Sequence, residues 1–192
     1  METVAGIATV ILALLTAGTR FIETRRSPAV TGVSLVFAWL GYTSNALWLS
    51  YGLRLDISVQ IWVSIAWGFV FTYILWRLNN RRITVKFVAL LILIFAASVI
   101  LAYALSADAA GWVAGSIICA STFPQAVKIW RTKDPEGVAP IAWIMAFISG
   151  IIWVLYGLAA SLLPVIVLNT VNTLIIAVIL AGIVRAHKYV RD

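Results

Sequence analysis

The stretch WLSYGL, Trp48 to Leu53, returns 105 positions later as WVLYGL, Trp153 to Leu158. Ser44 and Ser149 match at the same offset. A match that holds at one constant offset indicates an internal repeat. The chain is therefore expected to contain two related structural units, each carrying one copy of this stretch.

The composition around the repeat is that of an integral membrane protein. Hydrophobic residues make up 63% of the 192 positions, charged residues make up 11%, and the mean hydropathy is +1.05. A soluble globular domain carries about twice that share of charged residues. The net charge of +7 would suit a nucleic-acid-binding protein, but the basic residues fall between apolar runs rather than in a soluble domain. The expected partner is the lipid bilayer, and no nucleic-acid partner is expected.

Seven segments are apolar and long enough to cross a bilayer, which takes roughly 20 residues in a helix. We expect an all-α integral membrane fold with seven transmembrane helices, joined by short connections. The segments are 3–19, 32–51, 57–76, 85–106, 110–127, 138–158 and 162–184.

The repeat divides these segments into three, one and three. Segments one to three correspond to segments five to seven, and the fourth is left over. Two units of three helices have the same orientation only if an extra span separates them, as in one class of transporter repeat. We expect a first three-helix unit over 1–80, a linker helix over 81–108 that faces lipid, and a second unit with a short tail over 109–192.

Thirteen of the fourteen Lys and Arg residues fall on one side of such a bundle, and only Arg54 falls on the other. The positive-inside rule then places the N-terminus outside and the C-terminus in the cytoplasm. We expect a multi-pass protein of the cell membrane. Arg20 is counted here with the loop that follows the first segment.

No acidic residue falls in the middle of a segment, where it would mark ion or proton coupling. The sequence therefore predicts an uncharged cavity and uniport rather than ion-coupled transport. It shows no grouping of nucleophile, base or metal ligands, so neither an enzyme, a metal site nor a cofactor is expected. Cys119, the single cysteine, lies in an apolar segment and is expected to be a buried hydrophobic residue.

A specific resemblance rests on three features taken together: the dipeptide Pro124-Gln125, the basic turn KIWRTKDPEG over Lys128–Gly137, and the duplicated W-x-x-Y-G-L. With the three-one-three layout, the chain resembles PQ-loop proteins of the SWEET sugar-transporter type (MtN3/saliva family) over its whole length. The resemblance implies passive alternating access through a central cavity, with the two units rocking around a sugar site.

The resemblance also implies which residues line the substrate site. These are Trp48 and Trp153, Asn169 and, by the repeat, Ser64. The family more often has asparagine at the position of Ser64. The residue types suit a sugar, because indole rings pack against its C–H faces and amides pair with its hydroxyl groups. The alternatives are packing or interfacial anchoring for the tryptophans and an interhelical hydrogen bond for Asn169.

Gate and hinge positions are expected near both ends of the bundle. Pro124 lacks a backbone N–H and weakens the helix hydrogen bonding around it, and Gln125 can pair with the freed groups. The first unit has Gly18 instead of a proline there, and Pro140 stands near the start of segment six. These four residues are the inner-gate and hinge candidates. Tyr51 and Tyr156 are the outer-gate candidates.

The sequence favours facilitative uniport of a small sugar by alternating access. Two alternatives stay open: a carrier of a neutral amino acid or another polar metabolite, and a non-transporting seven-helix receptor on the same fold. The expected partners are a small-molecule sugar and the bilayer, with a homo-oligomer possible.

Overall fold

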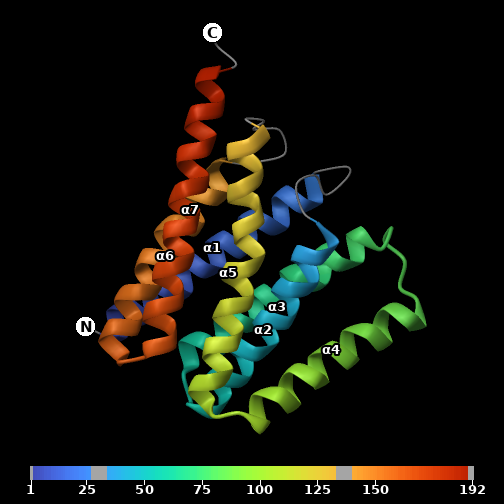
Figure 1. Cartoon of the computed structure of the whole chain (residues 1–192). Coiled ribbons are helices and arrows are strands. Elements are labelled where there is room, and N and C mark those ends of the chain that lie inside the picture. Colours follow the sequence, from blue (N-terminus) through green and yellow to red (C-terminus); the bar gives the residue numbers. More distant parts are fainter. Residues whose placement is uncertain (1, 27–33, 133–139, 190–192) are drawn as a thin grey trace.

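The protein is all-α, as the sequence predicts. The computed structural model describes residues 2–26, 34–132 and 140–189, and these form seven helices and no strand (Figure 1). Of the basic turn Lys128–Gly137, residues 128–132 belong to the helix that ends at Thr132, and residues 133–137 lie outside the described residues. The helices are α1 Glu2–Arg26, α2 Leu35–Arg54, α3 Ser58–Leu78, α4 Val85–Ala104, α5 Ala107–Thr132, α6 Pro140–Ala160 and α7 Leu163–Tyr189.

Five of the seven helices, α1, α3, α4, α6 and α7, are long and apolar enough to cross a membrane by length and composition alone, within the described residues. α2 and α5 are of similar length, with 20 and 26 residues. Both carry hydroxyl and amide side chains, among them Asn45 on α2 and Thr122 on α5, which lower their hydropathy. These two helices pack against each other and line the central cavity, so they need less apolar surface than a lipid-facing helix.

The helices pack in the same order within each group of three. α3 lies between α1 and α2, and α7 lies between α5 and α6. The two groups meet through α2 against α5 and through α1 against α6. The first helix of each group therefore packs against the second helix of the other, as a two-fold axis between the groups would require.

α4 runs along the outside of this arrangement (Figure 1). It packs against α2 and, over a shorter stretch, against α5. Its residues are mostly exposed, and only Ser98 and Ala102 are buried. An apolar helix with this much exposed surface suits contact with lipid, which is the position expected of the fourth segment.

The turns that close α2 and α6 repeat in backbone detail. Asp56 and Ser161, which stand 105 positions apart, both have a left-handed backbone with φ of 53° and 55°. The amide of Ile57 donates to the carbonyl of Gly52 at 2.8 Å, and the amide of Leu162 donates to Gly157 at 2.9 Å. We call this end of the bundle the tyrosine end, because Tyr51 and Tyr156 stand next to these glycines. The opposite end, where α1, α3, α5 and α7 finish, is the basic end.

Two arginines stabilise the ends of neighbouring helices. Arg77 of α3 is buried, and its guanidinium donates to the carbonyl of Thr24 at 2.7 Å near the end of α1. Arg54 of α2 donates to the carbonyls of Ala102 and Leu105, which end α4. The last carbonyls of a helix lack partners within it and carry partial negative charge, so both contacts are favourable.

Candidate functional site

A cavity of about 240 Å³ lies between the two groups of helices. Every helix except α4 contributes residues to its described lining. The volume lies just below the range of roughly 300–1,000 Å³ that is usual for drug-sized ligands. The cavity therefore suits a small solute.

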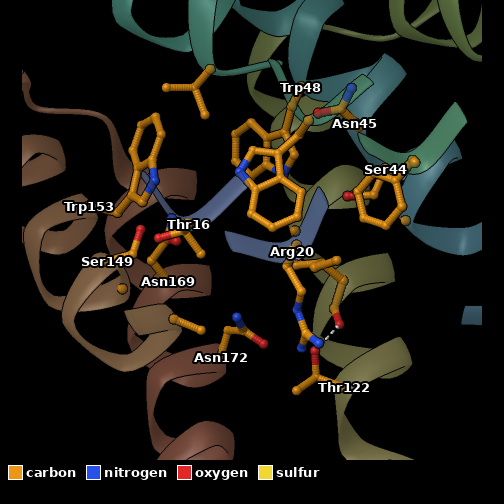
Figure 2. Close-up of a pocket in the computed structure, with 18 of the residues that line it drawn as sticks. Thr16, Arg20, Ser44, Asn45, Trp48, Thr122, Ser149, Trp153, Asn169 and Asn172 are labelled. Carbon is orange, nitrogen blue, oxygen red and sulfur yellow. Dashed lines mark hydrogen bonds between the residues drawn. The ribbon is translucent and has the colours of Figure 1, made fainter. Parts of the chain in front are cut away.

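Trp48 of α2 and Trp153 of α6 both line this cavity, so each group of helices contributes one tryptophan (Figure 2). Each indole is backed by the tyrosine three positions later in its own helix. The ring of Trp48 lies edge-on to Tyr51 at 5.4 Å, and that of Trp153 lies edge-on to Tyr156 at 5.8 Å. Edge-to-face pairs of this kind are favourable. The repeat thus places two similarly supported flat surfaces in one cavity.

Asn169 and Ser64 also line the cavity, but they do not offer the same groups to it. The amide nitrogen of Asn169 donates to the carbonyl of Val165 at 2.8 Å, which leaves its oxygen and its second N–H available to a solute. Ser64 is 1% exposed, and its hydroxyl accepts a hydrogen bond from the side chain of Gln60 at 3.1 Å. Ser64 is therefore a weaker candidate ligand than Asn169.

Asn45 of α2 is a lining residue that the sequence analysis missed. Its amide nitrogen donates to the carbonyl of Ser64 at 2.8 Å, so it ties α2 to α3 at the edge of the cavity. Its equivalent in the second group is Gly150, so the repeat gave no signal there. A Cβ built on Gly150 would meet the hydroxyl of Thr173, and the equivalent of Thr173 is Gly68, which adjoins Asn45. Each group thus pairs one polar side chain with one glycine. In the first group the polar residue is on α2 and the glycine on α3, whereas in the second group the glycine is on α6 and the polar residue on α7.

Asn172 of α7 is a second amide in the lining (Figure 2). Its side-chain oxygen is buried and has no hydrogen-bond partner among the described residues. A buried polar atom without a partner is destabilising. A solute hydroxyl or N–H group donated to this oxygen would relieve that cost.

The expectation of an uncharged cavity is wrong, because Arg20 lines it. Arg20 does not lie in a loop. The helix α1 continues to Arg26, beyond the end of the first apolar segment, and Arg20 stands within it. Its guanidinium lies 5.8 Å from the centre of the Trp143 ring on α6. Long basic side chains extend helices past their apolar part, because the stem stays in apolar surroundings while the charge reaches a polar region.

The described lining comes within about one turn of the basic end on three helices, and within one turn of the tyrosine end on α3 alone, through Gln60. Thr24, Phe37 and Ala142 line it within about one turn of the basic ends of α1, α2 and α6. Tyr51 is 0% exposed and Tyr156 is 5% exposed, and neither lines the cavity.

Each of these tyrosines packs over a glycine of the opposite group. A Cβ built on Gly111 of α5 would lie 3.1 Å from the Tyr51 ring, and one built on Gly6 of α1 would lie 3.5 Å from the Tyr156 ring. Gly6 and Gly111 again stand 105 positions apart. The groups are therefore in close contact at the tyrosine end, where side chains larger than hydrogen have little room.

The hinge candidates lie outside the cavity lining. Pro124 is exposed within α5, which remains one helix from Ala107 to Thr132, and Gln125 beside it is half-buried. A Cβ built on Gly18 would meet no atom within 4 Å. Pro140 is the first residue of α6, where a proline costs no helix hydrogen bond. The roles of these residues as hinges stay predictions.

The family model for the PQ loop repeat matches residues 107–166, which cover α5 and α6. A protein of Leptospira biflexa serovar Patoc, named as the sugar transporter SemiSWEET, is 31% identical over 70 residues. These residues are 36% of this chain and 82% of that protein.

This chain belongs to the SWEET and SemiSWEET family of PQ-loop proteins.

A second SemiSWEET, from Escherichia coli strain UMEA 3162-1, is 36% identical over 58 residues, which are 30% of this chain and 64% of that protein. Both relatives are less than half as long as this chain. The structure of a eukaryotic SWEET transporter superposes with a TM-score of 0.76 at 15% identity, over 97% of each chain. The chain therefore has the seven-helix integral membrane fold of a SWEET protein. Both SemiSWEET relatives are named as transporters, in agreement with the expectation that the chain is not an enzyme.

The close contact of Gly111 with Tyr51 gives a testable prediction about the tyrosine end. The Gly111→Ala variant should keep Tyr51 from packing fully and shift the population toward conformations open at that end. Overpacking costs about 1–3 kcal/mol, which corresponds to a change in population of roughly fivefold or more. The measurement is the rate at which a membrane-impermeant maleimide, added from the tyrosine end, labels Ser149→Cys in a Cys119→Ala background.

Ser116→Ala is the matched control, since Ser116 is an exposed residue of the same helix and lies outside the cavity lining. It should leave the labelling rate unchanged. Equal labelling rates in the Gly111→Ala variant and the parent protein would contradict a closure that depends on this contact.

Proposed function

We propose that this SWEET-family protein carries a small sugar across the cell membrane by facilitated, alternating-access transport. The observation that carries the proposal is the cavity with two tyrosine-backed tryptophans in equivalent positions of the two helix groups. The names of the SemiSWEET relatives, which are sugar transporters, support the same substrate class.

The sugar would be recognised by two kinds of group, the flat faces of the tryptophans and the polar atoms of the asparagines. The C–H faces of a sugar ring pack favourably against indole. The oxygens of Asn169 and Asn172 would accept hydrogen bonds from sugar hydroxyl groups, and these contacts fix orientation and specificity. Asn45 would support the site from α2, because its side-chain nitrogen donates to the carbonyl of Ser64 on α3.

Alternating access would come from rocking of the first unit, residues 1–80, against the second unit, residues 109–192, with 81–108 as the linker. The moving surfaces would be the contacts of α2 with α5 and of α1 with α6. In this structure the described lining comes within about one turn of the basic end on three helices, and the tyrosine end is packed. The positive-inside rule makes the basic end cytoplasmic and places the N-terminus outside. The structure would then be an inward-facing state, with Tyr51 and Tyr156 as the outer gate.

Uniport is favoured by the charges around the cavity. Among the described residues of its lining there is no Asp or Glu that could take up a proton or bind a cation during the cycle. The one ionised group there, Arg20, repels cations.

The substrate prediction is tested by uptake of labelled monosaccharides into proteoliposomes. Trp153→Ala should remove one stacking surface and Asn169→Ala one acceptor, and each should lower uptake about tenfold, as expected for one or two lost interactions of about 1 kcal/mol. Trp62→Ala and Thr170→Ala are the matched controls, because both residues are exposed and lie outside the lining. The controls should transport normally.

No uptake above empty vesicles would overturn the proposal. Uptake of neutral amino acids in place of sugars would assign the protein to another substrate class. Binding without flux would assign it to a receptor.

The hinge prediction concerns Pro124, whose equivalent in the first unit is Thr19. Pro124→Ala restores a helix N–H and should stiffen α5, so uptake should fall several-fold. Thr19→Ala, at the equivalent position, should lower uptake less than twofold. Equal effects of the two changes on initial uptake rates would contradict an asymmetric hinge.

A further inference from the structure

The outward faces of α5 and α7 carry a basic and aromatic cluster at the basic end of the bundle. It consists of Lys128, Trp130 and Arg131 on α5 and Arg185 on α7, and all four residues are exposed. We call it the α5–α7 cluster. The two helices pack against each other and run to the same end of the molecule (Figure 1). None of the four residues lines the cavity, so the cluster is separate from the solute site.

The indole of Trp130 is seated on the surface of α7. Its nitrogen donates to the carbonyl of Val178 at 2.9 Å. A Cβ built on Gly182 would lie 3.1 Å from that nitrogen, so a residue larger than glycine there would push the ring away from the helix. Trp130 is nonetheless 40% exposed. The ring therefore joins α5 to α7 and still presents part of its surface outward.

Arg185 lies over this ring, with its guanidinium carbon 5.1 Å from the ring centre. A cation over an indole face is attracted to it, and the contact limits the freedom of the side chain. Among the described residues the guanidinium has no hydrogen-bond acceptor and no acidic partner. Arg54 and Arg77, in contrast, donate to helix-end carbonyls. Arg185 is thus held in place while its N–H donors are unused.

The repeat does not duplicate this arrangement. The first group has Arg25 and Asn80 where the second has Trp130 and Arg185. The seat for the indole is missing as well, because Arg77 stands at the position of the glycine. That arginine is buried and donates to a carbonyl near the end of α1. The α5–α7 cluster therefore belongs to the second group alone and is not part of the duplicated frame.

An apolar stripe leads from the cluster toward the middle of the bundle. Leu174 and Val178 stand eleven and seven positions before Arg185, which puts them on one face of α7. Phe123 stands seven positions before Trp130 on α5 and shares its face in the same way. All three apolar residues are exposed. In a bilayer such a stripe contacts acyl chains, and a tryptophan at its end lies at the level of the headgroups.

We infer that the α5–α7 cluster binds an anionic phospholipid, with its phosphate on Arg185 and its acyl chains along the apolar stripe. A guanidinium presents its donors in a planar fork that matches phosphate oxygens. Lys128 and Arg131 add positive charge beside it, and basic sites between transmembrane helices bind anionic headgroups. The described residues of α5 and α7 at this end include no Asp or Glu that could pair with a choline group.

The occupant is a lipid rather than a soluble phosphate, because the stripe offers apolar surface that only acyl chains would use. The inference goes beyond the proposed function and does not depend on which solute occupies the cavity. Loss of lipid binding would leave the proposed sugar transport standing.

The test uses the full-length protein in phosphatidylcholine nanodiscs that contain a photoreactive lipid probe. The probe is phosphatidylglycerol or phosphatidylcholine, each with a diazirine in one acyl chain and at the same mole fraction. Cross-linked residues are mapped by mass spectrometry. We expect the phosphatidylglycerol probe to label residues 123–130 and 174–185 about fivefold more than the phosphatidylcholine probe, as one basic contact with an anionic lipid would give.

Arg185→Gln is the decisive variant, and it should bring labelling by the two probes to the same level. Arg185→Lys keeps the charge but loses the planar fork, so it should retain part of the preference. Trp130→Ala removes the ring under the guanidinium and should lower the preference. Arg26→Gln is the matched control, because Arg26 is exposed at the same end and is the equivalent of Arg131 in the first group. It should leave the preference unchanged.

Equal labelling by the two probes in the parent protein, or a preference that survives in Arg185→Gln, would overturn the inference. An equal loss in Arg26→Gln would also overturn it, because general surface charge would then explain the preference. Displacement of the phosphatidylglycerol probe by excess inorganic phosphate at constant ionic strength would assign the cluster to a soluble anion instead. An unchanged melting temperature and elution volume of Arg185→Gln in detergent would show that the lost preference is not lost folding.

Discussion

The arrangement of this protein depends on the close contact between two tyrosines and two glycines at one end of the bundle. Tyr51 packs over Gly111 and Tyr156 packs over Gly6, so each group of three helices contributes one ring and one glycine. These contacts bring α2 against α5 and α1 against α6 at the tyrosine end. The cavity lies between the groups, and the two tyrosine rings also pack against the two tryptophans that line it.

Within this symmetric frame the two halves carry different polar chemistry. The backbone turns, the glycine pairs Gly6/Gly111 and Gly52/Gly157 and the W-x-x-Y-G stretch repeat, whereas the amides and the charge of the cavity do not. Asn45 has a glycine as its equivalent, Ser64 has Asn169, and Arg20 has Gln125. Under the proposed transport, the symmetric frame would allow both ends to open by related movements, and the asymmetric lining would suit a solute that has no symmetry of its own.

The sequence predicted the features that depend on local hydropathy and on the repeat. Seven helices, the exposed fourth helix and the meeting of Trp48, Ser64, Trp153 and Asn169 at one cavity were all expected. The helix ends were not, because the apolar segment of α1 stops well before the helix does. Arg20 was assigned to a loop for that reason. Asn45 escaped notice because its equivalent is a glycine, and a repeat reveals only positions that both units share.

The contacts of Gly6 and Gly111 could not be predicted either, although the two glycines match at the repeat offset. Their significance lies in the crossing of helices from different groups, which no single segment encodes.

The central claim, that one cavity opens at either end in turn, is tested most directly by distances between spin labels at equivalent exposed positions. Labels at Leu53 and Leu158 report on the tyrosine end, and labels at Val36 and Ile141 report on the basic end, in a Cys119→Ala background. The account predicts that a change which lengthens the distance at the tyrosine end shortens the distance at the basic end. Gly111→Ala should lengthen the distance at the tyrosine end. Distances that stay fixed, or that lengthen together, would contradict it.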